Sequence, residues 1–140
     1  MGEFKVVEEG AFGDFEFEAK ADTLEKLFET CGLATFEAMT DVSRVEAIVE
    51  IHFDVSAESL EELLYAFLAE LIYVKDVDSV FISKYDISLQ ENYDLSCKAW
   101  GEIIDSEKHN LRTDVKAVTY HKLEIKKSNG GYSAHVILDL

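Results

Sequence analysis

Apolar and polar residues alternate early in the chain. In the segment 15–20, phenylalanine and alanine alternate with glutamate and lysine, and a period of two is typical of a strand with one buried face. Thr23 then stands at an N-cap position, because the residues that follow it have a helical period. Gly32 lies inside this helix at a cost of about 1 kcal/mol relative to alanine, which indicates close packing there. The helix is expected to run to about Thr40, with an apolar face of Leu24, Leu27, Phe28, Cys31, Ala34, Thr35 and Ala38.

A second helix is predicted to begin at Ser56 or Ser59. Ser59 and Glu62 have the spacing of a capping box, in which two side chains satisfy free backbone N–H groups at the helix start. The apolar stripe that follows is wider than a surface helix needs, so this helix should form the centre of the core. The stripe consists of Leu60, Leu63, Leu64, Phe67, Leu68, Leu71 and Ile72.

Several more strands are expected along the chain. The tetrapeptide 128–131, Ser-Asn-Gly-Gly, supplies a turn that joins the last two of them as a hairpin. Strands in runs, with two separate helices, predict an α+β fold in one domain, residues 1–140, with both helices on one face of a largely antiparallel sheet. The expected strands are Val45–Val55, Val80–Leu89, Leu95–Ile103, Lys116–Ile125 and Tyr132–Leu140.

Composition narrows the class of protein. The chain has 140 residues, 48% of them apolar, which suits one domain with a core of its own. It has no apolar stretch of about 18 residues, which argues against a membrane helix, and no secretory signal pattern at its start. Cys31 and Cys97 are expected to be buried, reduced thiols, as in a cytoplasmic protein.

The formal net charge is −16, and the acidic excess lies mainly in the first half. Residues 1–70 hold 18 acids and 4 bases, whereas residues 71–140 hold 11 acids and 9 bases. Such a surface repels phosphate backbones, so strong direct binding of nucleic acid is not expected. The segment 106–127 reverses the trend, with six bases and three acids. It is either a solvated surface or a contact site for an anion or an acidic partner.

The last residues join a strand pattern to negative charge. If the final strand pairs to its end, the Asp139 side chain and the Leu140 α-carboxylate are both held in place. Two anions held close together repel each other unless a cation lies between them, and Ca²⁺ or Mg²⁺ takes oxygen ligands of this kind. Asp14 could supply a third carboxylate. The alternative is a solvated chain end and an ordinary loop acid.

Signals for catalysis are few. The four histidines, His52, His109, His121 and His135, are scattered, and the sequence holds no HExxH, GxSxG, P-loop or GxGxxG motif. A metal-dependent hydrolase would need an open metal site and a general base. The sequence offers carboxylates but no base at a recognisable spacing.

Four segments, in order, resemble motifs of the archease family. Residues 24–41 are similar to the first helix of that family and residues 63–72 to its second. Residues 116–121, Lys-Ala-Val-Thr-Tyr-His, and residues 136–140, Val-Ile-Leu-Asp-Leu, resemble its two most specific motifs. The resemblance covers nearly the whole chain and implies an archease-like α+β fold.

The resemblance also implies a function. Archeases are activators of RtcB-type RNA ligases, which join tRNA exons after intron removal with GTP and a divalent metal. An archease is not itself the ligase: it promotes guanylylation of the ligase and multiple turnover. The family metal site, usually with calcium, carries over to Asp14, Asp139 and the Leu140 carboxylate. Lys116 matches the family lysine, and with Arg112 and His121 it is the expected partner contact.

One segment departs from the family pattern. Where the family commonly has His-Thr-Ala-Asp, this chain has Ala-Phe-Gly-Asp at positions 11–14. Glu16 is therefore an alternative to Asp14 as the early acid of the site. A second reading of the function is a metal-binding, chaperone-like modulator of another RNA-processing enzyme, such as a tRNA methyltransferase.

Overall fold

The computed structural model describes residues 2–7 and 14–140. In these residues the chain forms two α-helices, a short 3₁₀ helix and eight strands. The helices are α1 (Leu24–Glu37), η1 (Val42–Arg44) and α2 (Leu60–Asp78). The strands are β1 (Glu3–Val6), β2 (Asp14–Ala21), β3 (Val49–Ser56), β4 (Val80–Leu89), β5 (Asp94–Ile103), β6 (Ala117–Val118), β7 (Glu124–Ser128) and β8 (Gly131–Asp139).

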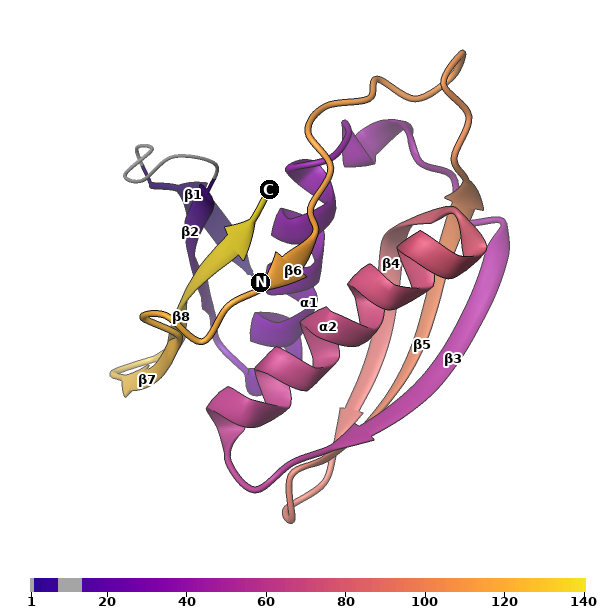
Figure 1. Cartoon of the computed structure of the whole chain (residues 1–140). Coiled ribbons are helices and arrows are strands. Elements are labelled where there is room, and N and C mark those ends of the chain that lie inside the picture. Colours follow the sequence, from indigo (N-terminus) through magenta and orange to yellow (C-terminus); the bar gives the residue numbers. More distant parts are fainter. Residues whose placement is uncertain (1, 8–13) are drawn as a thin grey trace.

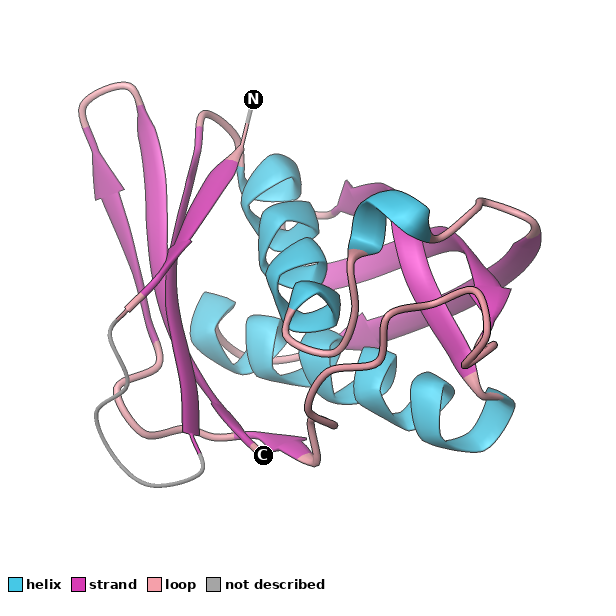
Figure 2. Ribbon diagram, turned by 90° about the horizontal axis from the view of Figure 1, so that it is seen from above, coloured by secondary structure: helices cyan, strands magenta, loops and turns pink. Residues whose placement is uncertain are grey.

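The strands form two antiparallel sheets with α1 and α2 between them (Figure 1, Figure 2). One sheet has the order β1-β2-β8-β6, and β7 also pairs with β8. The other has the order β3-β5-β4. Each helix contacts strands of both sheets, so the apolar surface of both helices and the inner faces of both sheets close around one core.

The α+β class is confirmed, but the layer arrangement differs from the one expected. The strands divide into two sheets on opposite sides of the helices, whereas one sheet with both helices on one face was predicted. The wide apolar stripe of α2 has its explanation here, because a helix between two sheets is buried on two sides. Alternation along a strand shows which face is buried but does not show which strands pair.

The predicted strand Lys116–Ile125 is wrong as one element. It is split into β6 and β7, and a turn separates them in which the Leu123 N–H donates to the Tyr120 carbonyl oxygen at 3.2 Å. Lys122 has a φ of 55°, in the left-handed region that a strand does not allow. Both pieces pair with β8, each over a different part of its length.

Helix starts follow the predicted caps, and several other boundaries shift. The side chains of Thr23 and Ser59 accept hydrogen bonds from the N–H groups of Lys26 and Glu62, each at 3.2 Å. The first helix ends at Glu37, and η1 occupies the segment before the strand expected from Val45, which begins at Val49. Helix α2 continues to Asp78, beyond the predicted stripe.

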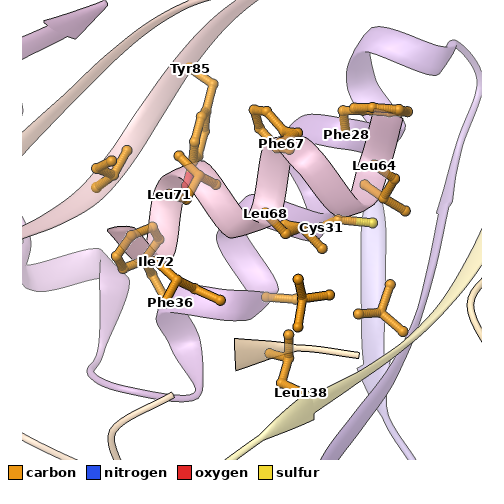
Figure 3. Close-up of a cluster of buried hydrophobic side chains, with 14 of the residues drawn as sticks. Phe28, Cys31, Phe36, Leu64, Phe67, Leu68, Leu71, Ile72, Tyr85 and Leu138 are labelled. Atoms are coloured by element: carbon orange, nitrogen blue, oxygen red, sulfur yellow. The ribbon is translucent and has the colours of Figure 1, made fainter. Parts of the chain in front are cut away.

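The core is built around the two helices (Figure 3). Phe28 of α1 and Phe67 of α2 lie with ring centroids 5.7 Å apart, and Leu138 of β8 is fully buried in the same cluster. A methyl group added at Gly32 would lie 2.8 Å from the Tyr85 ring, which confirms the close packing expected there. The cysteines are free and buried, and burial raises the pKa of the Cys97 thiol to about 12.

Candidate functional site

The end of β8 lies between two other strands. Asp139 is the cross-strand partner of Asp14 on β2 and of Ala117 on β6. Its carbonyl oxygen accepts a hydrogen bond from the N–H of Lys116 at 2.8 Å. Leu140 follows at once and packs against the core. The backbone of Asp139 is therefore held on both edges, as expected for a strand paired to its end.

The register brings two of the three predicted carboxylates together. Residues directly opposite each other in an antiparallel pair project to the same face, with Cα atoms about 5 Å apart. Asp14 and Asp139 stand in this relation, and like charges directly opposite each other destabilise a sheet. A cation between them would remove that cost. We call Asp14, Asp139 and Leu140 the carboxylate site.

The donor set of the carboxylate site suits a hard cation. Carboxylate oxygens are the ligands that Ca²⁺ prefers, and Asp139 is exposed while Asp14 is half-buried. In residues 2–7 and 14–140, no three His, Cys, Asp or Glu side chains gather closely enough to hold a metal ion. The predicted third ligand is a main-chain carboxylate rather than a side chain. Asp14, Asp139 and Leu140 thus fit a calcium ion in chemistry, and the metal itself stays a prediction.

Glu16, the alternative early acid, already has a partner. Its Oε2 atom lies 2.5 Å from Nε2 of His135, and Nδ1 of the same ring lies 3.0 Å from the carbonyl oxygen of Lys122. Both ring nitrogens of His135 are thus within hydrogen-bond distance of an oxygen, and Glu16 is engaged with this ring on the outer face of the sheet. The register therefore favours Asp14 as the acid opposite Asp139. The other residues of the family departure, 11–13, lie outside the described residues.

The three predicted partner contacts occupy different places. Lys116 immediately precedes β6, beside Asp139, and is exposed. His121 is exposed in the turn between β6 and β7. Arg112 instead ties its segment to the end of α1: its guanidinium donates to the Glu37 carbonyl oxygen at 2.6 Å, and its backbone N–H donates to the Met39 carbonyl oxygen at 2.8 Å. Lys116 is thus the one of the three that adjoins the carboxylate site.

Lys75 of α2 is a structural residue that the sequence analysis missed. It is 5% exposed, and its ammonium group donates to the carboxylates of Asp76 and Asp114 and to the carbonyl oxygen of Val115. Asp114 and Val115 come directly before Lys116. The buried ammonium group therefore fixes the approach of the chain to β6 and, through β6, to Asp139.

A second polar network holds the segment after β5. Nδ1 of buried His109 accepts from the Asp105 N–H at 3.0 Å, so Nε2 carries the proton and donates to Glu102, also at 3.0 Å. Lys108 donates to Glu102 at 2.6 Å and to Glu46 at 2.7 Å. Hydrogen bonds from Lys108, the Glu46 N–H and His109 lower the pKa of Glu102 to about 2. This network belongs to the fold rather than to the carboxylate site.

Comparison with known proteins identifies the family of this chain. A model of the Archease protein family matches residues 4–140. The chain belongs to the archease family. The archease of Pyrococcus furiosus is 37% identical over 131 residues, which cover 91% of this chain and 92% of the relative. An archease of Saccharolobus islandicus is 41% identical over 128 residues, with the same coverage of each chain.

Solved structures of the archease family agree with the fold. The solution structure of protein 1598 from Methanobacterium thermoautotrophicum is 39% identical, with a TM-score of 0.78, and covers 99% of this chain and 98% of that one. The crystal structure of an archease from Thermotoga maritima, described as a possible chaperone, has a TM-score of 0.66 at 16% identity over 96% of each chain. The second likeness concerns the fold alone. In the described residues, neither helix has the length and apolar character to cross a bilayer.

Proposed function

We propose that this protein is a non-catalytic accessory protein that activates an RtcB-type RNA ligase in tRNA splicing. It would act in the cytoplasm by promoting guanylylation of the ligase with GTP and by restoring multiple turnover. Membership of the archease family supports the accessory role. The observation that carries the proposal is the pairing of Asp14 with Asp139 beside Leu140, because it assembles the acidic tip that the family resemblance implies.

The carboxylate site would hold a calcium ion through Asp14, Asp139 and the main-chain carboxylate of Leu140. A bound divalent cation would neutralise the repulsion between the carboxylates and fix the tip for contact with the ligase. The chain itself supplies the rigidity: β8 is paired on both edges at Asp139, and Leu140 packs against the core. Lys116 adjoins this tip and adds a cation that can reach an acidic group of the partner.

Long-range charge supports the encounter with such a partner. A ligase that binds RNA presents a basic surface, and a chain of net charge −16 is attracted to it over a distance of about a Debye length. The surface charge speeds the encounter of the partners, and contact at the carboxylate site then determines whether the ligase is activated.

The test is RNA ligation by a purified RtcB-type ligase with substoichiometric amounts of this protein. The wild-type protein should restore multiple turnover, and Asp139→Asn should weaken the effect by at least about ten-fold. Asp54→Asn is the matched control, because Asp54 is exposed on β3 in the other sheet. Terbium luminescence, with calcium as competitor, should be lost in Asp139→Asn and in a variant without Leu140.

Other outcomes would contradict the proposal. If Asp139→Asn activates as well as the wild-type protein does, the carboxylate site is not the contact. If the wild-type protein leaves the ligase of its own organism unchanged but binds and stimulates a tRNA methyltransferase, the chaperone-like alternative replaces ligase activation.

A further inference from the structure

The outer face of the five-stranded sheet carries a groove of about 440 Å³ away from the paired carboxylates. Lys20, Lys122, Lys126, Ser133 and His135 contribute to its lining. The volume falls within the range of roughly 300–1,000 Å³ that is common for small-molecule sites. Three lysines around one groove are notable in a chain that has 13 bases against 29 acids.

The strand register explains why these side chains meet. Ser133 on β8 is the cross-strand partner of Lys20 on β2 and also of Lys126 on β7. The three residues therefore form one row across the sheet and project to the same face. Neighbouring strands lie about 5 Å apart, so one lysine stands on each side of the serine hydroxyl. A serine hydroxyl between two ammonium groups is an arrangement of donors that suits an anion.

Two acids also line the groove, and cations offset both of them. Glu18 lies 3.7 Å from Lys5, and Glu124 lies 3.4 Å from Lys126. Exposed ion pairs of this kind are weak, so Lys126 can exchange Glu124 for an anion that it binds more strongly. In the part of the chain that the structure describes, the side-chain ammonium groups of Lys20 and Lys122 make no ion pair or hydrogen bond. The lining holds three lysines against two glutamates, so its formal net charge is positive, unlike that of the whole chain.

The position of Lys122 in the lining of the groove has a structural reason. Its backbone adopts the left-handed conformation, with φ of 55°, and its carbonyl oxygen lies 3.0 Å from Nδ1 of His135. A lysine in this conformation costs about 1 kcal/mol or more. The contact with His135 holds the turn, and thus the lysine, beside the groove.

We propose that this groove binds a phosphate group. The phosphate oxygens accept hydrogen bonds from the Ser133 hydroxyl and from the ammonium groups of Lys20 and Lys126, and Lys122 lines the same groove. A free nucleotide and an RNA backbone both carry this group. The inference extends beyond ligase activation and does not depend on it, because it rests on side chains outside the carboxylate site.

The experiment is a titration of the ¹⁵N-labelled full chain, followed by NMR, with three probes: inorganic triphosphate, GTP and a short single-stranded RNA. At low salt we expect binding with a Kd below about 1 mM and shifts of the backbone amides of residues 20, 122, 126 and 133. If GTP binds more tightly than triphosphate, the ligand of the groove is a nucleotide. If RNA binds more tightly than both, the ligand is an RNA backbone. No saturable shift at these amides with any probe overturns the proposal.

Matched variants distinguish binding at this groove from attraction of the probe to positive charge in general. The double variant Lys20→Gln/Lys126→Gln should weaken binding by at least about ten-fold, and Ser133→Ala should weaken it further in the same background. Lys98→Gln is the control, because Lys98 is exposed on β5 in the other sheet, and it should change Kd less than about two-fold. The proposal is overturned if the loss of affinity per lysine removed is the same in the double variant and in Lys98→Gln. All the changed residues are at least partly exposed, and thermal melts verify that each variant folds.

Discussion

A single buried ammonium group holds the segment before β6. Lys75 is 5% exposed, while the carboxylates of Asp76 and Asp114 that it contacts are more than half exposed. Water can therefore solvate both acids if the ammonium group is removed. The carbonyl oxygen of Val115, 3.0 Å from the ammonium group, is in a buried residue and would lose its partner.

Replacing this lysine should therefore destabilise the protein moderately. For Lys75→Met we expect a loss of about 2 kcal/mol in the free energy of unfolding, since a buried acceptor loses its hydrogen bond while packing is largely kept. Urea denaturation measures this loss in the free energy of unfolding. Lys98→Met, at an exposed position, should stay within about 0.5 kcal/mol of the wild type. A Lys75→Met protein as stable as that control would show that the ammonium group contributes nothing to the fold.

The Glu102 network predicts a pH dependence of stability. The pKa of Glu102 falls from its ordinary 4.5 to about 2 in the folded protein. Between these values the unfolded chain binds more protons than the folded one, so this contribution is complete above about pH 4.5 and is lost as the pH falls towards 2. Glu102→Gln should lose stability at neutral pH and should be closer to the wild type near pH 3.

Urea midpoints at about pH 7, 5 and 3 test this prediction. The difference between wild type and Glu102→Gln should shrink as the pH falls. Glu50→Gln, a matched change at an exposed position on β3, should show no such trend. A difference that is constant across the range would mean that the charge of Glu102 is not what stabilises the network.

The sequence predicted residues that the strand register brings together, but it did not predict the polar networks around them. Asp139 and Leu140 were proposed from the strand pattern and charge at the chain end, Asp14 as a further carboxylate, and Lys116 from a family motif. Asp14 and Asp139 lie opposite each other because β2 and β8 pair in register. Lys75 was missed because two of its three partners lie 39 and 40 residues along the chain. The same holds for Glu16 and His135, which are 119 residues apart. Periodicity has no information on contacts over such separations.

At the level of elements, the pairing of β4 with β5 depends on one glycine. Gly101 is buried opposite the register shift between Ile82 and Lys84. A Cβ atom at this position would overlap the backbone carbonyl group of Phe81. The backbone cannot move away without breaking the pairing of the two strands, so the close approach requires glycine.

The corresponding prediction concerns Gly101→Ala. We expect a loss of about 3 kcal/mol, because the added methyl group meets backbone rather than a flexible side chain. Gly130→Ala is the control: it has open space around it and a φ of 86°, so it should cost about 1 kcal/mol from backbone strain alone. Thermal and urea unfolding give both values. Equal losses in the two variants would contradict the overlap.

The elements themselves were largely predictable. Both helices, their caps and most strands follow from local period and capping chemistry, which act within a few residues. The division into two sheets was not predictable, because an apolar strand face can be covered by either side of a helix layer. The break at Lys122 was missed because Lys116–Ile125 contains no glycine to signal a turn, and a lysine takes the left-handed conformation instead.

For the whole molecule, the charge of −16 acts in two opposite directions. Within the folded chain, like charges repel and favour expansion, so added salt should raise the melting temperature as it screens them. Between this protein and the basic ligase that we propose as its partner, the same screening removes attraction. Salt should therefore stabilise the protein and weaken its encounter with the partner.

Stopped-flow association with an RtcB-type ligase tests the second effect. Between about 50 and 300 mM NaCl we expect the association rate to fall by about ten-fold or more, while the dissociation rate changes little, since steering acts on the encounter. Melting curves in the same buffers exclude unfolding as the cause, because the melting temperature should rise over this range. Combining Glu50→Gln with Asp54→Asn, two exposed positions on β3, should reduce the salt dependence slightly, as two of 29 acids are removed. An association rate that is independent of salt would mean that short-range contacts at the carboxylate site, and not the acidic surface, control the encounter.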